Sequence, residues 1–335
     1  MKRSGLWIFL LFAASLATLF PGSASAAAGT QAVSPNLFLV TGLPDAGNVV
    51  LLKTTEGVIV VDAGDNAEQG KDIVEAARSL GAGPIRYVIL TQYHGDHTFG
   101  LQSFPPEAVI IGQDNISANI KAFSQADLTD YLERRAPQRL AGLRKEVESL
   151  RAAKSPDLAK KEEELKAAQE RYDKAKLLRL AYPQVTFSRD LTIHLGGETV
   201  RAIYPGPTHT SCSIAVYFET QKVLHPGDLF FYRKLPYIDR AAGSDTANLI
   251  AALQGFKKLD FDKVVPGHGD VTTKAALDEQ IDLLADLRSQ VKAALAQGQS
   301  LEDMKRKILF DKWKGFGFFD ILPVDIEAVY DELKK

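Results

Sequence analysis

Short, almost continuously apolar segments alternate with helical patterns in the first third of the chain. Residues 57–62, 85–90 and 108–111 have the length and the β-branched content of buried strands. Between the first two, residues 69–80 carry apolar side chains at helical spacing, and Gly81 follows where a helix typically ends. Strands that are buried on both faces and joined by helices predict an α/β fold in which helices cover a sheet.

Residues 126–180 have a different pattern, rich in Ala, Leu, Lys, Glu and Arg and poor in strand formers. Apolar residues recur there at helical spacing in two sets, namely Leu140, Leu143, Val147 and Leu150, then Leu165, Ala168, Tyr172 and Ala175. Ser155 and Pro156 lie between the sets, in the places of a helix N-cap and a first-turn proline. We therefore expect an inserted antiparallel helical hairpin with solvated charges, whose partner the sequence does not identify.

Strand patterns resume after this segment and are interleaved with further helices. The expected strands are 199–203, 213–218, 222–224 and 263–265. The expected helices are 246–259, 274–297, one that begins at the capping box 300–303, and 324–333. The sequence contains no internal repeat and no low-complexity linker, so residues 27–335 are predicted to form one domain with a helical insertion at about 126–180.

The first 26 residues have the pattern of a secretory signal peptide. Lys2 and Arg3 precede an apolar run at 6–20, which is short for a membrane span, and residues 24–26 (Ala-Ser-Ala) suit signal peptidase. Removing residues 1–26 from the 335-residue chain leaves 309 residues and changes the net charge from −2 to −4. We expect a periplasmic or secreted protein that begins at Ala27.

The charged residues nearly balance, with 40 Lys and Arg against 42 Asp and Glu. Such a chain has no overall basic field, so we expect no nucleic-acid partner. Its single cysteine, Cys212, excludes an internal disulfide framework and a zinc site built on several thiolates. We expect a small-molecule substrate and no membrane association once the signal peptide is removed.

Four of the six histidines lie in polar segments next to predicted strands. Residues 91–97 (Thr-Gln-Tyr-His-Gly-Asp-His) directly follow a buried strand, and His209, Asp228 and His268 each lie in a glycine-containing turn. Strand-end loops concentrate functional groups. Imidazoles and carboxylates that converge there are the donors that borderline divalent metals prefer, so the sequence predicts a metal site.

This ordered set resembles the signature of the metallo-β-lactamase-fold hydrolases over nearly the whole mature chain. The family pattern is Thr-His-x-His-x-Asp-His, followed by a lone His, a bridging Asp and a final Gly-His. The resemblance implies a four-layered αββα sandwich with two metal sites at the edge between its sheets. It also implies that His94 and His209 bind metal 1, that Asp96, His97 and His268 bind metal 2, that Asp228 bridges both, and that Asp62 is the strand-end acid behind the site.

Gln92 departs from the family pattern, because it occupies the position of the first motif histidine. An amide oxygen is a weaker donor to zinc than an imidazole nitrogen. We therefore expect Gln92 to be a weak ligand and metal 1 to be bound less tightly than metal 2. Some members of the family with true lactamase activity carry Gln here, so the change is compatible with an enzyme.

The resemblance implies an exported enzyme with two Zn²⁺ sites, in which a metal-bound hydroxide attacks an ester, an amide (β-lactams included) or a thioester. Asp96 and Asp228 are the candidate catalytic residues, which orient the hydroxide or move its proton. One alternative is a mononuclear iron-dependent sulfur dioxygenase that uses His94, His209 and Asp228. The other is a non-enzymatic binding protein in which the helical hairpin is the working part.

The remaining reactive residue types have structural interpretations. His194 is expected to be an exposed strand residue, His225 to support the site from behind, and Cys212 to be a small buried side chain. The aromatic segment 230–237 either lines the substrate site or packs in the core.

Overall fold

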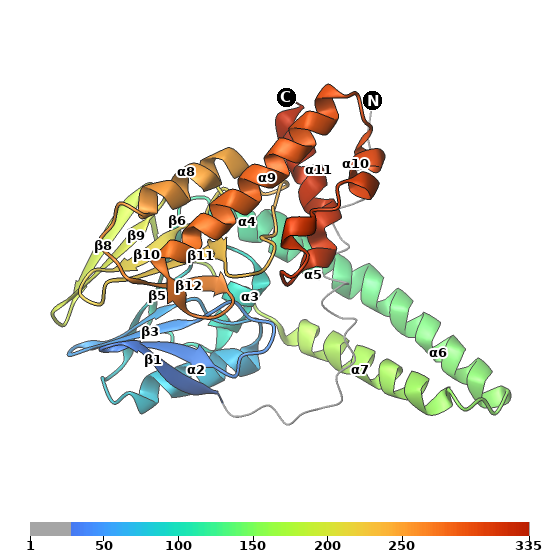
Figure 1. Cartoon of the computed structure of the whole chain (residues 1–335). Coiled ribbons are helices and arrows are strands. Elements are labelled where there is room, and N and C mark those ends of the chain that lie inside the picture. Colours follow the sequence, from blue (N-terminus) through green and yellow to red (C-terminus); the bar gives the residue numbers. More distant parts are fainter. Residues whose placement is uncertain (1–27, 335) are drawn as a thin grey trace.

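Two β-sheets lie face to face in the computed structural model, which describes residues 28–334 (Figure 1). The predicted signal peptide at 1–26 lies outside the described residues. Helix α2 covers the outer face of one sheet, helices α8 and α9 cover the other, and α11 packs against α9. This is the predicted four-layered αββα arrangement.

The first sheet contains seven strands that pair in chain order. They are β1 (Gly29–Ser34), β2 (Leu37–Thr41), β3 (Val50–Thr54), β4 (Gly57–Val61), β5 (Ile85–Ile89), β6 (Val109–Gln113) and β7 (Val185–Phe187). The pairs from β1 to β4 are antiparallel and those from β4 to β7 are parallel. Helix α2 (Ala67–Ser79) makes the crossover from β4 to β5 and is N-capped by Asn66, whose side chain accepts two backbone N–H bonds.

The second sheet has the strand order β13-β12-β11-β10-β9-β8. Its strands are β8 (Asp190–Leu195), β9 (Glu198–Ile203), β10 (Ala215–Phe218), β11 (Val223–Phe231), β12 (Lys263–His268) and β13 (Thr272–Thr273). The pair β11–β12 is parallel, and α8 (Thr246–Phe256) lies between these strands in the chain. Helices α9 (Leu277–Ala296), α10 (Leu301–Lys307) and α11 (Leu322–Leu333) follow, and the predicted cap of α10 is present, since Ser300 accepts the Asp303 N–H.

Three large apolar clusters hold the layers together. Strand β4 shows the principle, because Val58 and Val60 pack toward α2 whereas Ile59 and Val61 face the second sheet. A third cluster lies between the second sheet and helices α8, α9 and α11. A central strand buried on both faces needs a continuous apolar run, which explains the pattern read from the sequence.

A helical segment joins β6 to β7 and extends away from the sandwich (Figure 1). It comprises α4 (Ile116–Asn119), α5 (Ala126–Asp130), α6 (Ala136–Ala152) and α7 (Leu158–Leu177), with π-helical turns at Ile120–Gln125 and Tyr131–Arg135. The segment begins ten residues before the predicted start at residue 126. The reason is that Ile116 and Ile120 pack into the first-sheet core. Ser155 Oγ accepts the Asp157 N–H, but α7 itself begins only at Leu158.

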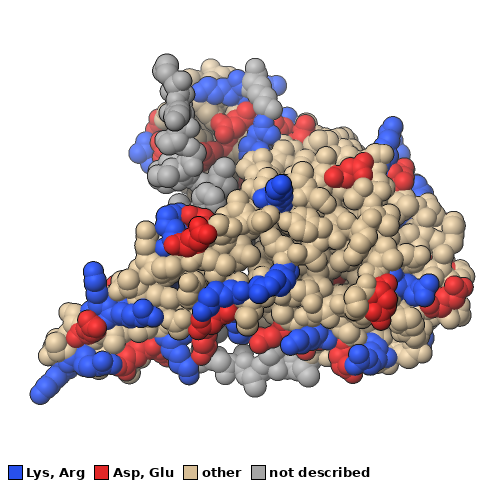
Figure 2. Space-filling view, turned by 180° about the vertical axis from the view of Figure 1, so that it is seen from behind, with Lys and Arg blue, Asp and Glu red and all other residues tan. Residues whose placement is uncertain are grey.

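Helices α6 and α7 form the predicted antiparallel hairpin with a small core of its own, made by Leu140, Leu143 and Ala168. Its outer faces carry intermingled Lys, Arg, Asp and Glu side chains (Figure 2), including the ion pair between Arg151 and Glu162. Within residues 28–334, no helix combines the length and the apolar character that a membrane span requires.

Candidate metal centre

The predicted site residues meet at one edge of the sandwich, where segments from both sheets end. His94, Asp96 and His97 lie in the loop after β5 and at the short helix α3 (Gly95–Thr98). His209 lies between β9 and β10, whereas Asp228 is within β11 and His268 ends β12. The first sheet thus provides one half of the site and the second sheet the other.

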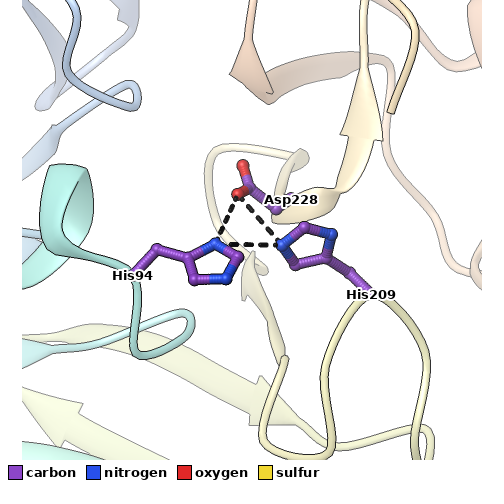
Figure 3. A group of neighbouring side chains, drawn as sticks. All are labelled: His94, His209 and Asp228. Carbon is purple, nitrogen blue, oxygen red and sulfur yellow. Dashed lines mark hydrogen bonds and ion pairs between the residues drawn. The ribbon is translucent and has the colours of Figure 1, made fainter. Parts of the chain in front are cut away.

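The side chains form two groups of three, and the donor atoms within each group lie within 4.8 Å of one another. The first group contains His94, His209 and Asp228 (Figure 3). Its atoms His94 Nδ1 and His209 Nε2 are 3.3 Å apart, and Asp228 Oδ2 lies 3.3 Å from His209 Nε2 and 4.0 Å from His94 Nδ1.

The second group contains Asp96, His97 and His268. Asp96 Oδ2 lies 3.3 Å from His97 Nε2 and 3.1 Å from His268 Nε2. Asp228 also reaches this group, because its Oδ2 is 3.3 Å from His97 Nε2 and its Oδ1 is 3.5 Å from His268 Nε2. Asp228 therefore lies between the two groups, where the sequence-based prediction places a bridging carboxylate.

The chemistry of these groups fits divalent cations. His97 Nε2 and Asp228 Oδ1 are buried without a hydrogen-bond partner, which is costly unless an ion or water satisfies them. His209 donates from Nδ1 to the Tyr237 carbonyl at 2.7 Å, so the Nε2 lone pair of the neutral ring points into the site. Imidazole nitrogens and carboxylate oxygens in groups of three are typical of zinc and related metals.

Burial and charge set the protonation states. Burial lowers the pKa of His209 to about 4, so this imidazole is neutral and ready to coordinate. Burial alone would raise the pKa of Asp228, but the charges of His97 and His268 outweigh it and hold that pKa below the usual range. Burial opposes the charged form of His97, but Asp228, Asp96 and Asp62 raise its pKa well above the ordinary value. A bound cation would displace the proton of His97.

Asp62 fixes the orientation of His97 from behind the site. This residue follows β4 in a left-handed conformation (φ 65°) and is fully buried. Its carboxylate accepts bonds from Thr91 N at 2.8 Å, Thr91 Oγ1 at 2.7 Å and His97 Nδ1 at 2.7 Å, which leaves His97 Nε2 directed at the metal groups. His225 is also buried, bonds through Nδ1 to the Val265 carbonyl, and places Nε2 3.7 Å from Asp62. Both residues occupy supporting positions, as expected.

Asp239 holds His94 in a corresponding way, although the sequence analysis did not single it out. Its Oδ2 lies 2.9 Å from His94 Nε2 and accepts the hydroxyl of Tyr93, while Oδ1 accepts the Ala242 N–H. Burial would raise the pKa of Asp239, but the hydrogen bond from His94 outweighs it and lowers the pKa to about 2. The one signal in the sequence was a carboxylate directly after the apolar and aromatic run Leu235-Pro236-Tyr237-Ile238.

Gln92 has an orientation that the sequence-based expectation did not anticipate. The residue is fully buried, its Oε1 accepts the His94 backbone N–H at 2.6 Å, and its Nε2 donates to Asp228 Oδ2 at 3.1 Å. The side chain therefore presents its NH₂ group to the centre, whereas a metal ligand would present the oxygen.

Aromatic rings lie next to three of the four donor histidines, His94, His209 and His268. Phe231 stacks on His268 with a centroid distance of 5.1 Å, and Phe318 meets the edge of the same ring at 6.0 Å. Tyr237 lies 5.8 Å from the His94 ring and 6.2 Å from the His209 ring. In the segment 230–237, Phe231 and Tyr237 lie next to the donor histidines, whereas Phe230 packs in the core.

The other expected placements are also found. His194 is exposed on β8, and Cys212 is fully buried, which raises the pKa of its thiol to about 11. Gly267 precedes His268 for a steric reason, because a Cβ there would lie 2.2 Å from Asp228 Oδ1. Glycine at this position leaves the central carboxylate its space.

The comparisons with known proteins agree with this geometry. The model of the metallo-beta-lactamase superfamily matches residues 42–111 and 134–268. The chain belongs to this superfamily. The matched ranges include all seven predicted site residues, and the predicted fold and family are confirmed.

Two curated members of the superfamily have similar sequences. The chain is 22% identical over 274 residues to a linear primary-alkylsulfatase of Pseudomonas sp., a match that covers 77% of this chain and 49% of the relative. It is also 22% identical over 274 residues to a metallo-beta-lactamase type 2 of Elizabethkingia meningoseptica, covering 79% of this chain and 88% of the relative. The chain thus spans about half the length of the alkylsulfatase.

A solved structure from the same superfamily shows the shared fold. The stereoselective inverting sec-alkylsulfatase Pisa1 of Pseudomonas sp. superposes with a TM-score of 0.63 and 18% sequence identity. The match covers 91% of this chain and 50% of that enzyme. At this level of identity the likeness establishes the fold alone.

Proposed function

We propose that this member of the metallo-β-lactamase superfamily is an exported zinc-dependent hydrolase with two metal sites. The observation that carries the proposal is the position of Asp228, whose two oxygens lie between a His94–His209 pair and a His97–His268 pair. A carboxylate shared in this way suits two cations held close together. Each group has two imidazoles and one carboxylate, a donor set that suits zinc.

Different residues of the chain would bind the metals, accept a proton and orient the imidazole rings. Zinc bound in the two groups would bring the pKa of a coordinated water close to neutrality and polarise the group under attack. Asp96 is 24% exposed at its side chain, so it can accept a hydrogen bond from the attacking water and take up its proton. Asp228 would balance part of the positive charge of the two cations, while Asp62 and Asp239 keep the rings of His97 and His94 in place.

The proposed substrate has a carboxylic ester, thioester, amide or sulfate ester bond next to an apolar group. The rings of Phe231, Tyr237 and Phe318 border the centre, and Phe318 is 42% exposed, so an apolar substituent has aromatic surface to contact. The alkylsulfatase and β-lactamase relatives support the inclusion of alkyl sulfates and β-lactams among the candidates.

The decisive test is a hydrolysis screen of zinc-loaded protein. Alkyl sulfates, β-lactams, thioesters, lactones and phosphodiesters are offered to the natural protein, to the chelated protein and to the zinc-reloaded protein. We expect turnover of at least one class that disappears on chelation and returns with zinc. Turnover that is unaffected by chelation, or absent from every class, would contradict the proposal. His194→Ala is a matched control, because that histidine is exposed on β8 and belongs to neither donor group.

Export is the second part of the proposal and rests on the sequence of residues 1–26. Signal-peptide removal after Ala26 would leave Ala27 at the N-terminus of a periplasmic or secreted protein. The intact mass of the protein isolated from its native host tests this directly. A mass that includes Met1 would contradict export by cleavage.

A second candidate function is a mononuclear iron-dependent oxygenation of a sulfur compound. It is favoured by one observation, namely that His94, His209 and Asp228 form a two-histidine, one-carboxylate group while the Gln92 oxygen faces away. That donor set is typical of non-haem iron oxygenases. Metal analysis of protein purified without chelators separates the two functions, since iron content with thiol-dependent oxygen uptake would favour the oxygenase.

A further inference from the structure

We propose that Gln92 is a positioning residue that holds Asp228 through a donated hydrogen bond, and that it does not coordinate a metal. This inference rests on the proposed metal centre, but it concerns bonds that the chain makes without metal. The side chain is fully buried and both ends of its amide are engaged, one with His94 and one with Asp228.

The identity of the two amide atoms follows from their neighbours. The backbone N–H of His94 can only donate, so the Gln92 atom that it meets at 2.6 Å is the oxygen. The ionised carboxylate of Asp228 can only accept, so the atom at 3.1 Å from its Oδ2 is the nitrogen. Rotating the amide to offer oxygen to a metal would break both bonds and turn the NH₂ group toward another N–H.

The two bonds connect the halves of the first donor group. Gln92 and His94 come from the loop after β5 of the first sheet, and Asp228 comes from β11 of the second. The Gln92 side chain is therefore bonded to the backbone of His94 and to the carboxylate of Asp228, and the two donor atoms of these residues, His94 Nδ1 and Asp228 Oδ2, lie 4.0 Å apart. A well-supported neighbour of this kind fixes ligand geometry before the metal binds.

Gln92 accordingly leaves the first site with three protein donors: His94 Nδ1, His209 Nε2 and Asp228. The remaining coordination positions are then open to water or substrate, as in catalytic rather than structural metal sites. The expected weaker binding of metal 1 then follows from the small number of protein donors at the first site, and not from weak coordination by the amide oxygen of Gln92.

Amide hydrogen exchange of the His94 backbone N–H, followed by NMR in metal-free and zinc-loaded protein, tests the assignment. We expect this N–H to be protected in both forms and to exchange at least tenfold faster in Gln92→Met, which removes its acceptor. The side-chain NH₂ signals of Gln92 should remain after zinc is added. Release of the His94 N–H in the natural protein on zinc binding would show that the amide has rotated onto the metal and would overturn the proposal.

The affinity of zinc gives a second measurement that requires no substrate. Gln92→Met should weaken the weaker zinc-binding step by about 10- to 100-fold, the usual effect of losing a residue that orients a ligand. Gln69→Met is the matched control, because Gln69 is also buried and bonds at both ends, to Asp65 N at 2.8 Å and the Pro44 carbonyl at 2.7 Å. We expect the control to change zinc affinity less than twofold.

The outcomes separate this proposal from the proposed function. An equal loss of zinc affinity in Gln69→Met and Gln92→Met would show a general packing effect and overturn the role of Gln92. The exchange experiment uses the natural protein, so it decides the question even where Gln92→Met does not fold. Failure of the hydrolysis screen would contradict hydrolase activity and leave the result for Gln92 unchanged.

Discussion

The Nε2 atom of His94 lies 2.9 Å from Oδ2 of Asp239, and this contact directs the opposite ring nitrogen at His209 and Asp228. The same carboxylate oxygen accepts the hydroxyl of Tyr93, the residue that precedes His94 in the chain. Because ligand orientation is set by such outer contacts, the first donor group depends on a residue far away in sequence.

Asp239→Asn should weaken the binding of zinc to the first group by about 10- to 100-fold. The amide oxygen can still accept the Ala242 N–H, but the charge that favours the proton on His94 Nε2 is lost. Zinc titration of metal-free protein, with a chromophoric chelator as competitor, measures the change. Tyr93→Phe is the milder companion, since it removes one bond and keeps the charge. Identical titrations for Asp239→Asn and the natural protein would show that Asp239 does not orient His94.

Asp228→Asn should reduce turnover by roughly two orders of magnitude or more, the scale of losing a major electrostatic contribution. Asparagine keeps the shape but removes the negative charge that serves both donor groups. We expect the first group, with three donors, to lose its zinc before the second. Zinc content by elemental analysis and turnover on the substrate found in the screen check both statements. Two zincs with full activity would rule out a bridging role.

Asp62→Asn provides the contrast to this variant. Asp62 contacts His97 through Nδ1, on the side of the ring away from the other donors. We therefore expect lower thermal stability, because a buried network with Thr91 and His97 is disturbed, but near-normal zinc stoichiometry. Differential scanning calorimetry and zinc analysis on the same sample separate stability from binding. Loss of zinc from folded Asp62→Asn would show that zinc binding depends on the contact between Asp62 and His97.

The fold and the donor groups could be predicted because both leave local patterns. Strand β4 reads as one apolar run since it packs on both faces, and the motif at 91–97 directly follows β5. His94, Asp96 and Asp228 each adjoin a glycine and His268 ends β12, so position and chemistry coincide in the sequence.

The supporting contacts could not be predicted, because they depend on how distant segments meet. Asp239 reaches His94 across 145 positions, and the orientation of Gln92 is decided by Asp228, 136 positions away. The predicted helical segment begins at residue 126, whereas the observed one begins at Ile116. Residues 116–125 are held by the packing of Ile116 and Ile120 into the first-sheet core. Tertiary contacts override local propensity in such places.

The helical hairpin should be dispensable for the metal centre. Its core of Leu140, Leu143 and Ala168 is separate from the three clusters of the sandwich. We expect replacement of residues 138–172 by a flexible linker of about ten residues to leave zinc content and turnover within about twofold, since antiparallel helices bring the cut ends together. Zinc analysis and kinetics check this. Loss of zinc on deletion would show that the hairpin supports the site.

The buried carboxyl of Asp325 should make the free energy of unfolding depend on pH, and this residue is not one of the metal donors. This residue lies in the first turn of α11, is 1% exposed and accepts the Ile238 N–H at 3.1 Å. Burial raises its pKa well above the ordinary value, and the single hydrogen bond from the backbone offsets this only in part. The folded protein therefore keeps the carboxyl protonated at pH values where the unfolded chain has lost the proton.

The sign of the effect follows from proton binding. Above the unfolded pKa of about 4 the native state binds more protons at this residue, so its contribution to the free energy of unfolding falls as pH rises toward the folded pKa. Asp325→Asn keeps an acceptor for Ile238 but has no titrating proton, so its stability relative to the natural protein should increase with pH. The slope is at most about 1.4 kcal/mol per pH unit.

Urea unfolding of chelated protein, repeated at several pH values from about 4.5 to about 7.5, measures the difference in free energy of unfolding between Asp325→Asn and the natural protein. The free energies of unfolding of Asp325→Asn and the natural protein should diverge as pH rises, whereas those of Asp325→Leu should include an additional constant loss from the unpaired Ile238 N–H. Differences that stay constant with pH in Asp325→Asn would show that the carboxyl has the same pKa in the folded and unfolded chain. A difference that shrinks with pH would reverse the sign and indicate an ionised carboxylate stabilised at the start of α11.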